Sequence, residues 1–217
     1  MIRNLKTSFK NNIPLCFSYF RKRKIGILGG SFNPAHSGHI HISSTAKLKL
    51  GLDEIWWLVA PQNRLKSHVG METFQKRLNY ARILTDKFNY IKVLDLEEKN
   101  NLYASYKTVK FLSRKSKTTK FIWVMGSDIL DNFNKWLYPS LITKKIPVAV
   151  IARPGYLSSL VNSNYSLNLG KRIKPSKSKV IFLKKKPLWI FIKQKLLAIS
   201  SSEIRLSQHL NKMDAKQ

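Results

Sequence analysis

The chain has 217 residues, enough for one domain with a sizeable core. Apolar residues make up 43% of it and aromatic residues 11%, which is typical of a globular protein and not of a disordered one. Its formal charge of +29 favours anionic partners: nucleic acid, membrane surfaces or phosphorylated small molecules. No apolar stretch reaches the roughly 18 residues that a membrane span needs. The single cysteine, Cys16, excludes a disulfide framework and favours a reducing compartment, so we expect a cytoplasmic protein.

The positive charge is scattered along the chain. The lysines are not interleaved with aromatic residues on one recognition helix, and no zinc-finger spacing, RNA-recognition signature or arginine-rich arm occurs. A genome rich in lysine, asparagine and isoleucine would give much of this composition without selection for binding. We therefore expect compositional bias together with an anionic substrate, and neither a specific nucleic acid nor a membrane as partner.

Residues 1–24 contain seven basic residues and no acidic one. Organellar transit peptides share that composition, whereas the apolar part is too short and too close to charges for a cleaved secretory signal. The simplest interpretation is a basic N-terminal extension followed by one domain over residues 25–217.

Hydrophobic periodicity predicts strands that alternate with helices. The strands are expected at residues 25–28, 54–60, 90–96, 121–125, 146–152 and 188–192. The helices are expected after His39 up to Gly51, at 73–87, at 104–114 and at the C-terminal end up to Leu210. Residues 153–186 predict a long basic loop and not a second domain. This order predicts a single α/β domain of the Rossmann-like, doubly wound type, with a mainly parallel sheet of five to six strands flanked by helices.

The segment 25–39 carries the strongest functional signal. A glycine pair follows the first strand, then a loop bent by Pro34, then His36 and His39 at a helix start. A lone pair of histidines three residues apart would more often be a coincidence near a turn. The glycines and Gly38 in the same window instead indicate a phosphate site between a first strand and a first helix.

The segment 199–205 gives a second signal. Serine hydroxyls and backbone N–H groups at a helix start, with Arg205 one turn in, can form an anion cradle. An ordinary capped helix is the alternative, because Ser200 and Glu203 have capping-box spacing. A joint phosphate site would require the fold to bring the two segments together.

These segments resemble the nucleotidyltransferase superfamily that carries GxFxPxHxGH and (I)SSTxIR motifs. The matching residues are Gly-Gly-Ser-Phe-Asn-Pro-Ala-His-Ser-Gly-His from 29 to 39 and Ile-Ser-Ser-Ser-Glu-Ile-Arg from 199 to 205. Three more segments resemble the bacterial nicotinate-nucleotide adenylyltransferase branch: 61–66, Gly126-Ser127-Asp128 followed by Trp136, and 152–156. The resemblance runs from about residue 24 to residue 210.

The sequence also departs from the pattern of that branch. Arg64 stands where the loop after the second strand usually has proline. The Tyr-Thr-x-x-Thr-Leu stretch is present only as residues 104–109, with its tyrosine missing or displaced to Tyr103. The basic insertion before Trp189 has no counterpart in the pattern.

The resemblance implies that a mononucleotide 5′-phosphate attacks the α-phosphorus of ATP and that pyrophosphate leaves. Because the attacking phosphate is already anionic, the reaction needs alignment and charge stabilisation and no general base. The resemblance assigns catalysis to His36, His39 and Arg205. It assigns ATP binding to Gly29, Gly30, Ser31, Phe32, Lys66, Gly126, Asp128, Ser201 and Ser202, and mononucleotide binding to Thr108, Trp136 and Arg153. Mg²⁺ is expected to arrive on the phosphates of ATP, with no protein ligand set of its own.

Other interpretations remain open from the sequence. The same fold takes other acceptors, such as nicotinamide mononucleotide, phosphopantetheine or a cytidylyl-transfer substrate. A fragment of a class I aminoacyl-tRNA synthetase is another alternative, because that enzyme shares the histidine motif. The chain is far too short for the whole enzyme, however, and residues 200–205 fit the transferase better. A basic nucleic-acid-binding protein would not depend on the histidines for its activity. The sequence gives no oligomeric state.

Overall fold

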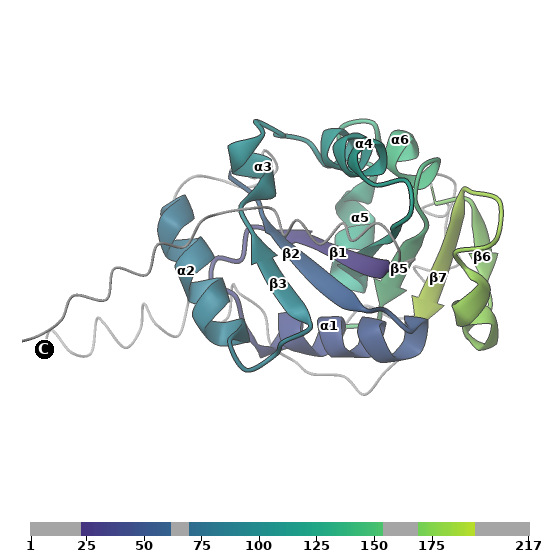
Figure 1. Ribbon diagram of the computed structural model, residues 1–217, viewed down its shortest axis with the longest axis horizontal. Helices are drawn as coiled ribbons and strands as arrows, with labels where there is room; N and C mark the ends of the chain where they lie inside the picture. Colours follow the sequence, from purple (N-terminus) through teal and green to yellow (C-terminus); the bar gives the residue numbers. More distant parts are fainter. Residues whose placement is uncertain (1–22, 62–69, 154–168, 194–217) are drawn as a thin grey trace, which may run out of the picture.

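The computed structural model describes residues 23–61, 70–153 and 169–193 (Figure 1). Seven strands form one sheet in the order β3-β2-β1-β4-β5-β7-β6, and all paired neighbours run parallel. The strands are β1 (Lys24–Gly30), β2 (Glu54–Val59), β3 (Ile91–Leu94), β4 (Lys120–Gly126), β5 (Val148–Ile151), β6 (Lys171–Ile173) and β7 (Leu188–Ile192). The predicted α/β fold with a parallel sheet is confirmed, and the sheet has seven strands where five or six were expected.

Helices cover both faces of the sheet. They are α1 (Ser37–Leu50), α2 (Phe74–Thr85), α3 (Leu96–Lys99), α4 (Ser105–Lys115), α5 (Leu130–Phe133) and α6 (Pro139–Thr143), with the 3₁₀ helices η1 (Ser127–Ile129) and η4 (Pro175–Val180). In Figure 1 the helix α1 lies on the opposite side of the sheet from α4 and α6. Strands buried on both faces read as continuous apolar runs, which is why β5 and β7 are apolar at every position.

Two apolar cores lie between the sheet and its helices, one on each face of the sheet. One packs Ile42, Ala46 and Leu50 of α1 against Trp57 and other β2 side chains. The second packs α4 and α6 against the opposite face, where Trp123 and Trp189 are almost fully buried. Alternate residues of each central strand enter opposite cores, as the period of a β-strand requires. The two cores make the sheet a rigid support for whatever lies at its edges.

Most predicted elements are confirmed, with several differences. The first helix ends where expected, at Gly51, which adopts a left-handed conformation (φ +61°). The third strand is shorter than expected, because Leu96–Lys99 turn into α3. The expected loop over 153–186 contains β6 and η4 within its described part. The short α5 and α6 were not predicted, and the expected terminal helix lies outside the described residues.

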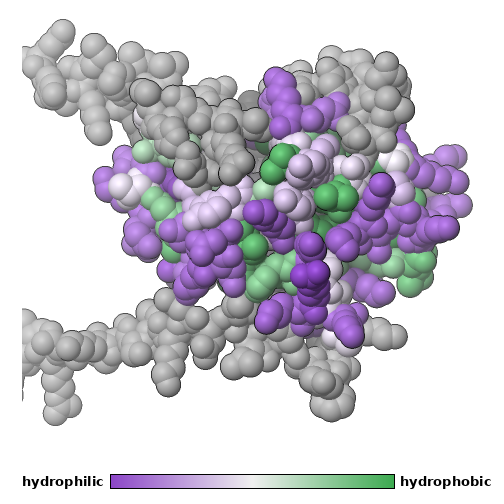
Figure 2. All heavy atoms as spheres, turned by 90° about the horizontal axis from the view of Figure 1, so that it is seen from above, coloured by the Kyte–Doolittle hydropathy of each residue, from purple (hydrophilic) through white to green (hydrophobic). Residues whose placement is uncertain are grey.

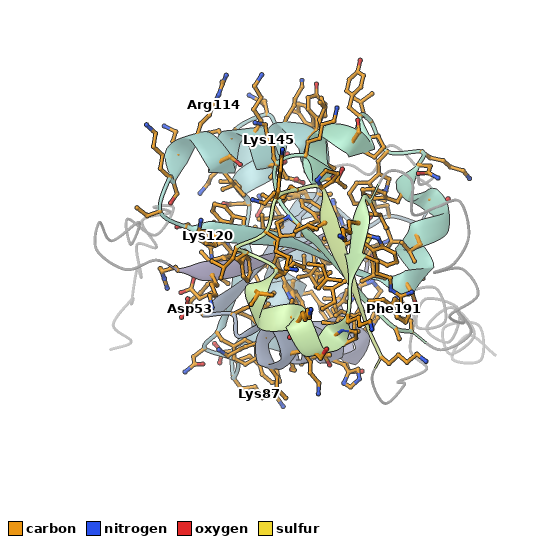
Figure 3. The ribbon with its side chains drawn as sticks, turned by 90° about the vertical axis from the view of Figure 1, so that its right-hand side faces the viewer. Asp53, Lys87, Arg114, Lys120, Lys145 and Phe191 are labelled. Atoms are coloured by element: carbon orange, nitrogen blue, oxygen red, sulfur yellow. The ribbon has the colours of Figure 1, made fainter. Side chains whose placement is uncertain are left out.

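The strand order identifies one candidate ligand-binding site, at the carboxyl ends of β1 and β4. The chain leaves β1 toward β2 on one side and leaves β4 toward β5 on the other, so the order of connections reverses between β1 and β4. Ligands of open α/β sheets bind beyond the carboxyl ends of the strands at this point. In Figure 3 the amino ends are marked by Lys120 and Asp53, and Phe191 near the end of β7 marks the carboxyl ends. Within the described residues, no helix is long and apolar enough to cross a membrane.

Candidate active site

The loop between β1 and α1 forms the first half of the site. It follows Gly30 and turns at Phe32, whose φ of +49° is a left-handed conformation that costs a non-glycine residue about 1–3 kcal/mol. The Phe32 ring is buried and stacks on Trp57, with ring centroids 4.8 Å apart and planes 13° apart. The same ring lies 4.9 Å from His39. Packing therefore offsets the strain and fixes the turn beside the second histidine.

The two histidines form a reciprocal capping box at the start of α1. His36 is the N-cap residue, and its Nδ1 accepts from the backbone N–H of Gly38 at 3.1 Å. His39, at the third helical position, completes the capping box, because its Nδ1 accepts from the backbone N–H of His36 at 3.2 Å. The ring centroids are 3.9 Å apart. The sequence predicted that both imidazoles share a helix start, and the structure confirms it.

These hydrogen bonds assign the proton of each neutral imidazole ring. A nitrogen that accepts a hydrogen bond carries no proton, so the proton of each ring is on Nε2. Each histidine therefore presents an Nε2–H donor while its Nδ1 closes the helix end. Such donors, fixed by backbone contacts, suit the stabilisation of developing negative charge on a phosphoryl group.

A buried arginine supports this loop from behind. Arg77 of α2 is only 3% exposed, and Nη1 donates to the carbonyl of Ser31 at 2.6 Å and to that of Ala60 at 2.8 Å. Its other nitrogens donate to the carbonyls of Pro61 and Glu72 at 2.8 and 3.0 Å. Burial lowers the pKa of Arg77, and a more distant attraction from Glu98 opposes the shift. One guanidinium thus joins the loop, the end of β2 and the start of α2.

Asn33 makes a second connection between the same segments. Its side-chain amide donates to the carbonyl of Gly70 at 3.0 Å, and its oxygen accepts from the backbone N–H of Glu72 at 3.1 Å. Neither Asn33 nor Arg77 was predicted as a site residue. Asparagine is common in turns and arginine on helix surfaces, so neither residue type signals this role in the sequence.

The carboxyl end of β4 forms the second half of the site. Asp128 follows Gly126 and accepts through Oδ2 from Nη1 of Arg153 at 2.8 Å. The backbone N–H of Arg153 donates to the Ser127 hydroxyl at 2.9 Å. The sequence assigned Asp128 to ATP and Arg153 to the mononucleotide, and the structure places the two side chains in one ion pair. Asp128 Oδ1 is buried and has no hydrogen-bond partner among the described residues.

Gly126 has no room for a side chain at this position. A Cβ there would lie 2.3 Å from Asp128 Oδ1 and 2.7 Å from Arg153 Cδ. We therefore expect Gly126→Ala to displace the ion pair, to lower kcat/KM by ~10-fold or more, and to destabilise the fold by about 1–3 kcal/mol. Steady-state kinetics and chemical denaturation measure the two effects.

Gly26→Ala is the matched control for this substitution. Its Cβ would meet the ends of Ile55 and Leu52 side chains at 2.7 and 2.8 Å, within the apolar core and near the start of β1. It should lower stability without changing kcat/KM of the folded enzyme. Equal loss of activity in both variants would contradict the role given to Gly126.

The remaining predicted residues occupy different environments. Trp136 is partly buried and packs edge-on against Trp123, with centroids 5.7 Å apart. Thr108 of α4 is fully buried, and its hydroxyl donates to Glu97 Oε1 at 2.7 Å. Contact of either residue with a mononucleotide stays a prediction. Four other assigned residues lie outside the described part of the chain: Lys66, Ser201, Ser202 and Arg205.

Glu97, which the sequence did not single out, is the partner of Thr108 and an unusual carboxyl. Burial raises its pKa to about 7, and the hydrogen bond from Thr108 opposes the shift. The folded protein thus keeps a proton that the unfolded chain loses near pH 4.5, so this residue makes stability fall as the pH rises from about 4.5 to about 7.

Glu97→Gln should remove this pH dependence, because glutamine imitates the protonated acid. The variant should match the parent below about pH 4.5 and exceed its free energy of unfolding by about 3 kcal/mol above pH 7. Urea denaturation across this pH range measures the difference. A difference that stays constant with pH would show that burial does not raise the pKa of Glu97.

Comparison with known proteins places the chain in a family. Residues 27–207 match the family model described as cytidylyltransferase-like. The probable nicotinate-nucleotide adenylyltransferase of Methylorubrum extorquens (strain PA1) is 36% identical over 184 residues, which cover 84% of this chain and 98% of the relative. The chain belongs to the nicotinate-nucleotide adenylyltransferase family. The probable nicotinate-nucleotide adenylyltransferase of Agrobacterium fabrum is also 36% identical, over 83% of this chain and 97% of its own.

Solved structures agree with the fold. The nicotinic acid mononucleotide adenylyltransferase of Plasmodium falciparum, in its complex with NaAD, superposes with a TM-score of 0.62 at 22% identity. The match covers 84% of this chain and 82% of that one. This likeness supports the fold, and the relatives at 36% identity confirm the family resemblance that the sequence motifs indicated.

Proposed function

We propose that the protein transfers the adenylyl group of ATP to nicotinate mononucleotide, giving nicotinate adenine dinucleotide and pyrophosphate in NAD biosynthesis. The observation that carries the proposal is the pair of histidines at the topological switch point, His36 and His39, whose Nδ1 atoms both accept backbone hydrogen bonds. The names of the relatives at 36% identity support this acceptor.

The reaction forms one bond and breaks one. A phosphate oxygen of the mononucleotide attacks the α-phosphorus of ATP, and the bond from that phosphorus to the bridging oxygen of the β-phosphate breaks. The electron pair leaves with pyrophosphate, so no proton needs to be removed. The chain's contribution is to align the two nucleotides and to stabilise charge on the transferring group, as in phosphoryl transfer generally.

In this proposal the histidines donate to the oxygens of the transferring phosphoryl group. The Gly29–Phe32 backbone lies along the nucleotides, and Asp128 Oδ1 is an acceptor placed for a ribose hydroxyl. Lys66, Ser201, Ser202 and Arg205 hold the triphosphate, while Thr108, Trp136 and Arg153 belong to the mononucleotide side. All of these contacts are assignments from the motifs.

Mg²⁺ fits this arrangement as a companion of ATP. Within the described residues, no group of three or more histidine, cysteine or acidic side chains could hold a metal ion. Mg²⁺ keeps several waters and binds through substrate phosphates, so it neutralises the triphosphate without a protein cage. We further propose a cytoplasmic location and a domain that begins at residue 25.

A pyrophosphate-release assay with ATP and separate acceptors tests the function. Nicotinate mononucleotide should be the best acceptor by kcat/KM, with nicotinamide mononucleotide weaker and phosphopantetheine inactive. Turnover with phosphopantetheine but not with nicotinate mononucleotide would overturn the acceptor and keep the chemistry. Absence of ATP-dependent pyrophosphate release with every acceptor would overturn both.

A further inference from the structure

The acidic residues are unevenly distributed in the fold. All described acidic residues lie between Asp53 and Asp131, and none occurs in the described stretches 99–127, 132–153 and 169–193. These stretches build α4, α6 and the half of the sheet from β4 to β6. The two acidic residues of this half, Asp128 and Asp131, follow the carboxyl end of β4. The described amino ends of β4, β5, β6 and β7 therefore carry lysines and no acidic residue.

Topology gathers its cations at the amino ends of the strands, the edge opposite the candidate active site. Lys120 begins β4, Lys144 and Lys145 precede β5, and Lys184–Lys186 precede β7. The strands β4, β5 and β7 are consecutive in the sheet, so these lysines lie along one edge of it. The starts of β5 and β7 are within one residue of the same register, and β4 starts three residues earlier, at Lys120. Lys117 joins them at the end of the connection from α4. We call this set the basic edge: Lys117, Lys120, Lys144, Lys145, Lys184, Lys185 and Lys186.

Two members of the basic edge, Lys120 and Lys186, are close enough for their positive charges to repel. Burial lowers the pKa of Lys186, and the positive charge of Lys120 lowers it further. Apart from half-buried Lys186, every member is exposed, and none pairs with a carboxylate in the described part of the chain. The acids at the start of β2 are already engaged: Asp53 accepts from the backbone N–H of Lys24, and Glu54 pairs with Arg23.

Figure 3 shows Arg114, Lys120 and Lys145 on one side of the molecule, with Lys87 at the bottom, away from them. Figure 2 shows that the adjoining face over α4 and α6 is mostly hydrophilic, with separate apolar side chains between charged ones. A helix that binds in a membrane surface presents a broad apolar face, whereas a cluster of lysines without one is attracted to anionic groups by charge alone. The basic edge consists instead of strand starts and loops, which suits contact with a polyanion.

We propose that the basic edge binds the phosphate backbone of nucleic acid without reading its sequence. Each lysine that neutralises a phosphate releases a counterion, which favours binding at low salt. Because the edge lies opposite the carboxyl ends of the strands, binding leaves the adenylyl-transfer site open. Full enzymatic activity is therefore expected with nucleic acid bound.

Fluorescence anisotropy of a labelled oligouridylate over a salt series tests the proposal on the full chain. Lys120→Gln/Lys145→Gln should weaken binding and reduce the slope of log K against log salt by about 1.4, since each phosphate contact on a single strand contributes about 0.7. The matched control is Lys49→Gln/Lys87→Gln, which removes the same charge from exposed lysines of the α1 and α2 side. It should keep the parental slope. Both variants should keep parental pyrophosphate release.

Three results would overturn the proposal. Equal slopes in the two double variants would show that net charge, and not this edge, attracts the oligonucleotide. No measurable binding by the parent at low salt would exclude the interaction itself. Binding to phosphatidylserine vesicles that depends on Lys120 and Lys145, without binding to the oligouridylate, would assign the edge to a membrane.

Discussion

His36→Asn is expected to lower kcat by at least ~10²-fold while leaving the protein as stable as the parent. The side-chain oxygen of asparagine can take the place of Nδ1 and accept from the Gly38 backbone N–H, and asparagine is among the best N-cap residues. It has no donor at the position of Nε2, however. The substitution therefore separates the structural hydrogen bond of this histidine from its proposed catalytic one.

His36→Ala is the comparison that makes the result specific. It removes both functions, so it should lose the same activity and also about 1 kcal/mol of stability, the usual cost of losing an N-cap. Pyrophosphate release gives kcat for each of the two variants, and urea denaturation gives the free energy of unfolding of each. An asparagine variant with near-parental kcat would refute the catalytic role and leave His36 as a helix cap only.

His39 allows the same test with a different substitution. Its Nδ1 accepts from the His36 backbone, and its ring lies between His36 and the Phe32–Trp57 stack. His39→Gln can place an amide donor near the position of Nε2, so it should retain more activity than His39→Asn. If both variants are equally inactive, the ring itself and not the donor is required.

The sequence predicted the half of the site whose residue types are unusual. Glycine pairs, a proline and two spaced histidines in one loop are rare by chance, and Gly126-Ser127-Asp128 ends an obvious apolar run. The structure places both segments at the carboxyl ends of neighbouring strands. Their joint position follows from the strand order, which local periodicity does not contain.

The sequence could not reveal interactions made by ordinary residue types in ordinary places. The strand β6, Lys171-Arg172-Ile173, is short, charged and paired on one side only, so it lacks the apolar run that marks the central strands. The Arg153–Asp128 ion pair joins residues 25 positions apart. The tautomers of His36 and His39 follow from hydrogen bonds between their rings and the backbone. These bonds depend on the three-dimensional fold and cannot be read from the sequence.

Arg77 is the clearest case, and its replacement should have the largest effect on stability. Arg77→Met keeps an apolar stem of similar length and removes four hydrogen bonds to the carbonyls of Ser31, Ala60, Pro61 and Glu72. Each buried carbonyl left without a donor costs about 1–3 kcal/mol, but those near the surface can bind water. We therefore expect a total loss of about 2–4 kcal/mol, measured by urea denaturation.

Arg82→Met provides the control on the same helix. Arg82 is 44% exposed and lies 3.7 Å from Asp95, so its loss should change stability by less than about 1 kcal/mol. Identical denaturation midpoints for the two variants would show that the Arg77 hydrogen bonds are replaced by water at no cost.

Arg77→Met should also lower activity, whereas Arg82→Met should not. The reason is that Arg77 holds the Ser31 carbonyl, which immediately precedes the strained turn at Phe32. If that turn relaxes, Phe32 leaves the position that fixes the His39 ring, and kcat should fall by ~10-fold or more at temperatures where the variant is still folded. Arg77→Lys keeps the charge but not the planar fork, so it should recover stability in part and kcat less. Parental kcat in folded Arg77→Met would show that packing of Phe32 on Trp57 alone maintains the catalytic loop.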